Sequence, residues 1–223
     1  QKVFDAFTLI FTETEHGWVW AHAYKFDDGT STFIVECSPG TWEGLGFGAM
    51  DQDETCRACE ALFAHWLDGE GLMSNARHLR GSAWLNFPRV LCETWVHDKL
   101  VLLGDAAHTA HFSIGSGTKL ALESAISLAK HVSDDKDLTT AFEKYEEARR
   151  LEVLRLQSAA RNSVEWFEDV ERYLDLDPVQ LNYSMLTRSQ RISHENLRLR
   201  DPDWLREAET WFQPQAGANG VPR

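Results

Sequence analysis

The sequence is short of basic residues, and this shortage argues against two classes of partner. Its 22 lysines and arginines stand against 35 aspartates and glutamates, which gives a formal net charge of −13 at pH 7. A protein that follows a phosphate backbone or an anionic lipid surface needs clustered basic side chains. We therefore expect no nucleic acid partner and no membrane partner.

Cysteine is scarce as well. Four cysteines in 223 residues are too few for a disulfide framework, and none has the paired spacing of a metal site. We therefore expect no metal centre. Cys56 and Cys59 fall in a helical pattern, where their sulfurs are expected to pack rather than to form a redox pair.

Long apolar runs are also absent. No stretch approaches the roughly 18 to 20 apolar residues of a membrane span, and the first residues do not have the layout of a signal peptide. With 43% hydrophobic and 26% charged residues, the composition is that of a globular protein. These features predict a soluble protein in a reducing, cytoplasmic setting.

Both ends of the sequence lack features of natural chain ends. There is no initiator methionine, and a strand-like run begins at once at Phe4. Residues 213–223 are small, polar and rich in proline and glycine, which is typical of a linker or tail. We therefore expect the chain to be an internal piece of a longer protein.

Strand-like runs fill the first 48 residues. Residues 4–13, 18–26 and 31–36 are rich in β-branched and aromatic side chains and are separated by turn signals such as Asp28-Gly29. This pattern predicts a β-meander. The alternation across residues 18–24 predicts one packed face and one face toward a ligand or solvent.

Beyond these strands the pattern is mostly helical. Three segments have apolar residues at three- and four-residue spacing. They are residues 53–67, 117 to about 131, and 138 to about 166. Residues 99–103 instead end in a short apolar run of the kind found in a buried strand. Residues 168–212 are predicted to be helical in patches, with breaks at Asp177-Pro178 and Asp201-Pro202.

The most informative segment runs from residue 102 to residue 118. The predicted buried strand delivers Gly104 and Asp105 at its carboxyl end, a loop follows, and Gly115-Ser116-Gly117 opens a helix. Proteins of the α/β class place ligands where strand ends meet a helix N-terminus, whose free amides favour negative charge. Glycines allow close approach of the backbone, and an aspartate can accept hydrogen bonds from sugar hydroxyls. The glycines alone fit an aspartate turn and a glycine-capped helix equally well.

The residues of this segment resemble those of a known family. Gly104-Asp105-Ala106-Ala107-His108, followed by Gly-x-Gly at 115–117, is similar to the second FAD-binding motif of the class A flavoprotein aromatic monooxygenases, the para-hydroxybenzoate hydroxylase-like group. Residues 110–120, with 84–88 upstream, resemble more narrowly the aryl-CoA branch, which includes the salicylyl-CoA 5-hydroxylases and the 2-aminobenzoyl-CoA monooxygenases. The resemblance extends from about residue 3 to about residue 212.

The sequence departs from the family pattern in two places. Ser124 stands where the aryl-CoA branch usually has an aspartate. The Gly-x-Gly-x-x-Gly loop that holds the ADP half of FAD in this family is missing from the sequence. The resemblance therefore implies a C-terminal fragment without the N-terminal FAD-binding half. In isolation, such a fragment is expected to be inactive and colourless and to bind FAD weakly.

The resemblance implies an α+β or α/β fold. Its parts are a β-meander substrate domain, the C-terminal part of an FAD-binding Rossmann-like domain, and long C-terminal helices. The expected boundaries are 1–92 for the substrate-binding sheet domain with one amphipathic helix, 93–135 for the second FAD-binding motif, 136–212 for the helical region, and 213–223 for a linker or tail. A reductase-like domain is expected to follow, as in bifunctional members of the aryl-CoA branch.

The resemblance also implies a chemistry. In this family NAD(P)H reduces FAD, dioxygen adds to it, and the flavin hydroperoxide passes a hydroxyl group to an activated aromatic ring. The residues expected to bind the cofactor are Gly104, Asp105, Ile114, Gly115, Ser116, Gly117 and Thr118. The residues expected to line the space between flavin and substrate are His111, Phe112 and Ser113. His108 is expected to support the loop by hydrogen bonding rather than to act as a base.

The substrate chamber is expected at the wall formed by the β-meander. The candidates to face an aromatic group are Trp18, Trp20, His22 and Trp42. Tryptophans serve packing more often than ligand contact. Arg77, Arg80 and Arg89 are surface residues by default, or contacts of CoA phosphates if the substrate is a thioester. Three functions stay open: hydroxylation of an aryl-CoA, hydroxylation of a free indole or phenolic acid, and a non-catalytic substrate-domain and interaction fragment.

Overall fold

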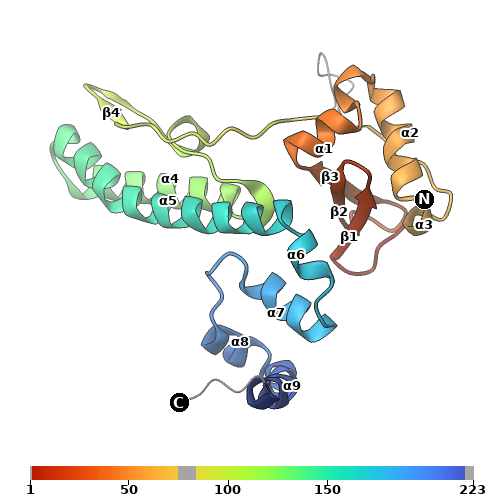
Figure 1. Ribbon diagram of the computed structural model, residues 1–223. Helices are drawn as coiled ribbons and strands as arrows, with labels where there is room; N and C mark the ends of the chain where they lie inside the picture. Colours follow the sequence, from red (N-terminus) through yellow and green to blue (C-terminus); the bar gives the residue numbers. More distant parts are fainter. Residues whose placement is uncertain (1, 75–83, 219–223) are drawn as a thin grey trace. The chain divides into compact units, whose positions relative to one another are not determined.

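The computed structural model describes residues 2–74 and 84–218, with side chains up to residue 213. Its contacts divide the chain into two compact units, Gln1–Asn86 and Phe87–Arg223 (Figure 1). The expected mixed architecture, with a small sheet and long C-terminal helices, is confirmed. Arg77 and Arg80, two of the three arginines considered for CoA phosphates, lie outside the described residues.

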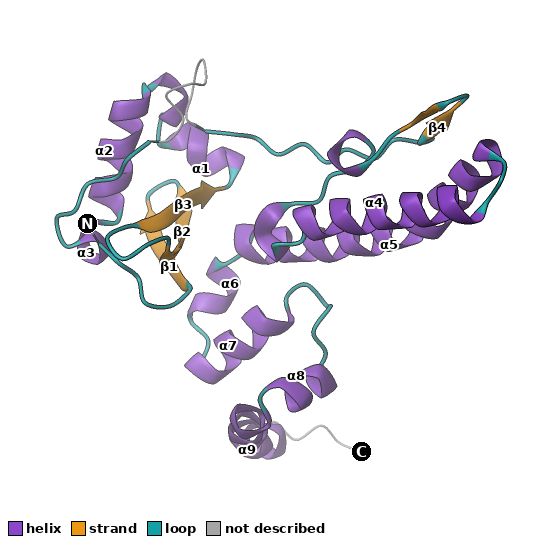
Figure 2. Cartoon of the chain, turned by 180° about the vertical axis from the view of Figure 1, so that it is seen from behind, coloured by secondary structure: helices purple, strands orange, loops and turns teal. Residues whose placement is uncertain are grey.

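The first unit is built on a three-stranded antiparallel sheet, which confirms the predicted β-meander. The strands β1 (Thr8–Thr14), β2 (Gly17–Lys25) and β3 (Ser31–Cys37) lie in the order β1-β2-β3 (Figure 2). In this register Trp20 of the central strand lies opposite Phe11 on one side and Glu36 on the other. Neighbouring strands are joined by short turns, as the sequence predicts.

The two faces of β2 carry different side chains because successive residues of a strand point to opposite sides. Val19, Ala21 and Ala23 are buried in a hydrophobic core cluster that also contains Phe63 and Leu67. The alternate residues of β2, which begin with Trp18, therefore share the other face.

Helices cover the core face of this sheet. They are α1 (Pro39–Gly44), the 3-10 turn η1 (Phe47–Ala49), α2 (Gln52–Leu62) and α3 (Ala64–Leu67). Asp51 and Glu54 form a reciprocal capping box at the start of α2. The helix predicted over 53–67 is interrupted at Phe63, whose fully buried ring belongs to the core. Cys59 is buried as expected, and burial raises the pKa of its thiol to about 12.

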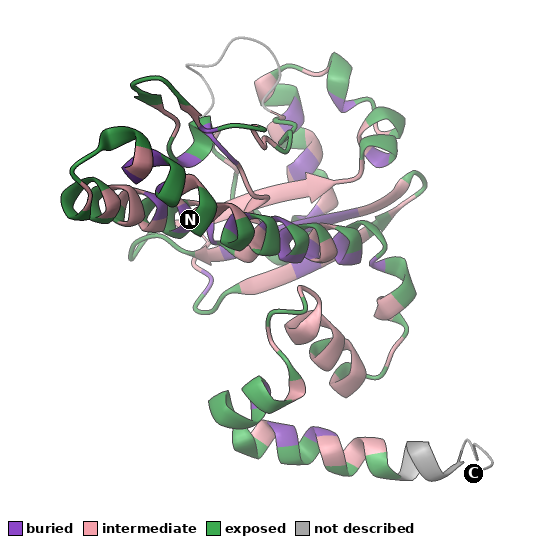
Figure 3. Cartoon of the chain, turned by 90° about the vertical axis from the view of Figure 1, so that its left-hand side faces the viewer, coloured by how far each residue is buried: buried purple, intermediate pink, exposed green. Residues whose placement is uncertain are grey.

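The second unit is dominated by a helical hairpin. The helices α4 (Gly117–Asp134) and α5 (Leu138–Glu168) lie side by side (Figure 1). Asp137 begins α5 by accepting a hydrogen bond from the Thr140 amide at 2.9 Å. Buried positions recur along α5 (Figure 3). The core cluster of this unit consists of Trp95, Ala107, Leu120, Tyr145 and Val153.

The prediction of a buried strand at residues 99–103 is wrong. The structure has a two-residue strand β5 (Leu100–Val101), paired antiparallel with β4 (Val96–His97). Leu100 is 72% exposed and Leu103 is 37% exposed. The turn at Asp98, where φ is +50°, closes a tight hairpin. Because alternate strand residues face opposite sides, Val101 packs against the core cluster while Leu100 points away from it.

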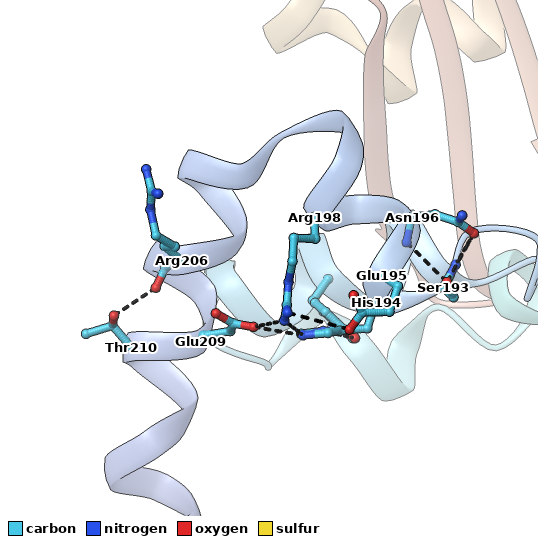
Figure 4. Close-up of polar contacts among 9 residues, drawn as sticks. Ser193, His194, Glu195, Asn196, Arg198, Arg206, Glu209 and Thr210 are labelled. Atoms are coloured by element: carbon cyan, nitrogen blue, oxygen red, sulfur yellow. Dashed lines mark hydrogen bonds and ion pairs between the residues drawn. The ribbon is translucent and has the colours of Figure 1, made fainter.

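Four helices complete the chain as far as residue 218. They are α6 (Glu171–Leu174), α7 (Pro178–Thr187), α8 (His194–Arg200) and α9 (Pro202–Ala218). The predicted breaks are confirmed, because α7 and α9 begin at the prolines that follow Asp177 and Asp201. Glu209 of α9 joins the last two helices by accepting from His194 at 2.9 Å and from Arg198 at 2.6 Å (Figure 4). Among the described helices, none combines the length and the apolar character of a membrane span.

Candidate cofactor-binding site

The candidate site begins at Gly104, where the chain leaves the β4–β5 hairpin. Gly104 has a φ of +57°, and a Cβ atom built on it would lie 3.2 Å from the Cβ of Ala121 on α4. A left-handed backbone and close helix packing both require glycine at this position. The residues Gly104–Ala106 form a 3-10 turn, η2, which is followed directly by Ala107 and His108.

Asp105 lies in this turn with its side chain exposed. Within the described part of the chain, its carboxylate accepts no hydrogen bond and forms no ion pair. An aspartate with its acceptor positions unused can receive hydrogen bonds from the hydroxyl groups of a ligand. This placement fits the role predicted for it.

The buried side chain of His108 supports the site by a hydrogen bond to α4, as expected. Its ring is 1% exposed, and Nε2 lies 3.3 Å from Oγ of the fully buried Ser124 on α4. The ring also lies 5.0 Å from that of Trp95. Burial, with a smaller contribution from Arg149, lowers the pKa of His108 below 6.5. Ser124, which departs from the family pattern, therefore serves as a hydrogen-bonding partner of this histidine.

Gln157 holds the chain before and after this turn together, and sequence analysis missed it. Its buried side-chain amide on α5 donates to the carbonyl oxygens of Val90 at 2.8 Å and Thr109 at 2.7 Å. A glutamine among the charged residues of a long helix gave no sequence signal of this contact. These two hydrogen bonds therefore connect α5 to the segments that form the isolated β-bridge between Leu91 and His108.

The predicted flavin-proximal loop is a compact turn. Nδ1 of His111 accepts a hydrogen bond from the Ser113 amide at 3.2 Å, so a neutral ring carries its proton on Nε2. The rings of His111 and Phe112 stack at 4.7 Å. Residues Phe112–Ile114 form the 3-10 turn η3, and Gly115 follows with a φ of +59°. The loop thus places the imidazole of His111 against the aromatic ring of Phe112.

Three features of the loop bear on its predicted role in cofactor binding. The Ser113 hydroxyl is buried, and no described residue hydrogen-bonds to it. A Cβ atom built on Gly115 or Gly117 would meet no atom within 4 Å, so both glycines border open space. Ser116, which precedes α4, makes no capping hydrogen bond to the first turn, because its hydroxyl donates to the Ile114 carbonyl instead. The first amides of α4, which include Thr118, therefore donate no hydrogen bond to the Ser116 side chain.

Three of the four predicted substrate-chamber residues come together on the sheet of the first unit. Trp18, Trp20 and His22 share the face of β2 opposite its core face. Trp20 is 3% exposed and His22 is 5% exposed. The Nε2 atom of His22 lies 2.8 Å from a carboxylate oxygen of Glu36, a partner that sequence analysis did not identify. Trp42 lies apart from them on α1, where its ring abuts Gly48.

A cavity of about 620 Å³ lies next to His111 in the second unit. Its apolar lining includes Phe87 and Val164, and its charged lining includes Arg89 and Glu168. Burial raises the pKa of the Glu168 carboxyl. Arg89 and His111 therefore line the same cavity.

Comparison with known proteins gives three informative relatives, although no protein-family model matches the chain. The chain is 38% identical to salicyloyl-CoA 5-hydroxylase of a Streptomyces species, over 94% of this chain and 41% of the relative. It is 37% identical to protodeoxyviolaceinate monooxygenase of Chromobacterium violaceum, over 84% of this chain and 49% of the relative. It is 35% identical to 3-hydroxy-4-methyl-anthranilyl-[aryl-carrier protein] 5-monooxygenase of Streptosporangium sibiricum, over 88% of this chain and 50% of the relative.

A solved structure shares the fold. PqsL from Pseudomonas aeruginosa, in complex with 2-aminobenzoylacetate, superimposes with a TM-score of 0.51 at 21% identity, over 73% of this chain and 44% of that one. The chain therefore spans half or less of the length of each of these four proteins. The similarity to named hydroxylases and monooxygenases covers nearly the whole chain, including the loop described above. Over most of its length, the chain is therefore similar to one part of proteins named as hydroxylases and monooxygenases.

Proposed function

We propose that the whole protein hydroxylates the aromatic ring of an aryl-CoA thioester, with FAD as cofactor, NAD(P)H as electron donor and dioxygen as co-substrate. The observation that carries this proposal is the 38% identity with a salicyloyl-CoA 5-hydroxylase across 94% of the chain. The geometry of the loop supports it, because the open faces of Gly115 and Gly117 leave room for a flat cofactor.

Different residues of the loop would bind different parts of FAD. Asp105 would accept hydrogen bonds from ribityl or ribose hydroxyls, and the backbone from Gly115 to Thr118 would lie against the isoalloxazine ring. When bound, FAD supplies the redox chemistry that activates dioxygen. The N-terminus of α4 favours negative charge on the ring. His111, Phe112 and Ser113 would form the wall next to the ring, where they would exclude water.

Two observations support a thioester substrate. Arg89 lines the cavity next to His111 and is exposed, so it can meet a phosphate of CoA. A second relative, at 35% identity, is named for an aryl group that is attached to a carrier protein. Like an aryl-CoA, such a substrate is an acyl group attached to a large partner. Within the first unit, the face of β2 that carries Trp18, Trp20 and His22 stays the proposed surface for an aromatic group.

A free aromatic substrate is the second candidate. The relative at 37% identity, protodeoxyviolaceinate monooxygenase, is not named for a thioester. This similarity is nearly as high as that to the CoA-dependent enzyme. Hydroxylation of an indole or phenolic acid is therefore kept as the alternative within the same chemistry. A third possibility is that the 223-residue chain alone acts as a non-catalytic interaction fragment.

Paired kinetics separate these candidates. Purified whole protein with FAD and NAD(P)H is given salicylyl-CoA or salicylate, and hydroxylated product is measured by chromatography. We expect kcat/KM for the thioester to exceed that for the free acid by about 100-fold, since binding of the remote CoA helps to position the ring. Equal values for the two substrates would make the free acid the preferred candidate.

A further inference from the structure

Two arginines that follow α7 contact the flavin-proximal loop. Nη2 of Arg188 donates to the Ser113 carbonyl oxygen at 3.2 Å. Nη1 of Arg191 donates to the Ser116 hydroxyl at 3.1 Å. Both contacts join residues 75 positions apart in the sequence. The loop is therefore held from a helical region that sequence analysis assigned no role.

Arg188 is fixed on several sides. Its Nε donates to the Ser163 hydroxyl at 2.9 Å, and Nη1 donates to the Met185 carbonyl oxygen at 2.7 Å. The guanidinium also lies over the ring of Phe167, 5.1 Å from its centroid. Because the planar group is anchored to α5 and α7, the directions of the two N–H bonds on Nη2 are set. One of these bonds is donated to the Ser113 carbonyl oxygen and helps to fix its position.

The positive charges of both arginines lack a carboxylate partner in the described part of the chain. This is unusual for a protein of net charge −13. A guanidinium as enclosed as that of Arg188 is normally paired with an acid. Burial lowers the pKa of Arg188, which expresses the cost of keeping this charge away from water. An unpaired cation next to a ligand loop favours a ligand that becomes negative.

We propose that Arg188 and Arg191 are positioning residues of the cofactor loop, which fix its conformation and favour the anionic, reduced form of the bound flavin over the oxidised form. Arg188 supplies most of the rigidity and Arg191 supplies exposed charge at Ser116. This inference rests on the proposed FAD binding. The inference adds to the proposed FAD binding separate roles for two arginines that lie outside the FAD-binding motif.

Hydrogen exchange of the unliganded protein tests the effect on loop conformation. The amides of Ser113 and Gly115 are protected by hydrogen bonds to His111 and to the Phe112 carbonyl, respectively. In Arg188→Gln we expect these two amides to exchange about tenfold faster. Arg172→Gln is the matched control, since Arg172 contacts the Tyr173 ring and does not reach the loop. Unchanged exchange in a folded Arg188→Gln protein would overturn the role of Arg188 in the loop.

The reduction potential of the FAD-loaded whole protein tests the effect of charge. In Arg191→Gln we expect the preference for reduced over oxidised flavin to fall about tenfold, which is about 30 mV for a two-electron couple. Arg191→Lys keeps the charge and should restore most of this shift. Equal potentials in wild type and Arg191→Gln would overturn the electrostatic role. This test does not depend on Arg188→Gln, so it stays decisive if that variant fails to fold. If the wild-type protein binds no FAD, the proposed function fails, while the exchange experiment still decides the conformational role.

Discussion

Gly104 and Gly115 both have a left-handed backbone, with φ of +57° and +59°, yet their surroundings differ. The position of a Cβ atom on Gly104 is occupied by Ala121, whereas the corresponding positions on Gly115 and Gly117 are open. The sequence predicted that these glycines form one motif. It could not separate a glycine needed for folding from glycines that leave room for a ligand, because that difference depends on the neighbouring helix.

Substitution of these glycines by alanine should separate stability from cofactor binding. We expect Gly104→Ala to lower the free energy of unfolding by about 1–3 kcal/mol, because alanine is strained at this φ and crowds α4. Gly117→Ala has no positive φ and no close neighbour, so its stability should stay within about 0.5 kcal/mol of wild type. Denaturant unfolding of both variants checks this. Equal losses at the two positions would show that the packing at Gly104 has been misassigned.

The exposed carboxylate of Asp105 should matter for FAD binding and little for folding. In the whole protein, we expect Asp105→Asn to weaken FAD binding by roughly one to two decades, since a hydrogen bond to a charged group contributes about 1.5–3 kcal/mol. Glu143→Gln, which removes one negative charge from an exposed position of α5, is the control for net charge. Titration of both variants with FAD gives the comparison. Unchanged affinity in Asp105→Asn would remove Asp105 from the site.

At the scale of elements, local signals predicted the β-meander, the helix pair α4–α5 and the breaks at Asp177 and Asp201. Each depends on periodicity or capping within a few residues. The strand predicted at 99–103 was wrong because burial depends on which partner the segment meets, and an apolar run does not specify that partner. The contacts of Gln157 and Arg188 with the loop were missed for the same reason, since both span long distances in sequence.

The packing of the η2 turn on α4 should make stability depend on pH through His108. Burial lowers the pKa of this histidine in the folded state, whereas in the unfolded state it titrates near 6.5. The unfolded state therefore binds more protons as the pH falls below about 6.5, so the free energy of unfolding decreases there. At pH values well above 6.5, the free energy of unfolding keeps its full value.

Denaturant unfolding from pH 7.5 down to pH 5 measures this dependence. We expect His108→Asn to have a shallower loss of stability than wild type across this range. The control is His97→Asn, whose side chain in wild type is 87% exposed, and it should keep the wild-type slope. Identical slopes in wild type and His108→Asn would show that the buried histidine does not account for the pH dependence.

At the scale of the whole molecule, the chain holds one part of the proposed cofactor site. It contains the Asp105 turn and the start of α4, while it spans 41% of the length of the salicyloyl-CoA 5-hydroxylase that it resembles. No Gly-x-Gly-x-x-Gly loop for the ADP half of FAD occurs in its sequence. On the proposed function, these residues would bind the flavin half of the cofactor, and the ADP half would need contacts from outside this chain.

The most direct test of this account is a titration of FAD, followed by quenching of flavin fluorescence, with the whole protein and with the isolated 223-residue chain. We expect the whole protein to bind one FAD tightly and the isolated chain to bind at least about 100-fold more weakly, since the half-site lacks the contacts to ADP. Absence of FAD binding by the whole protein, or equally tight binding by the isolated chain, would contradict the assignment of the cofactor site.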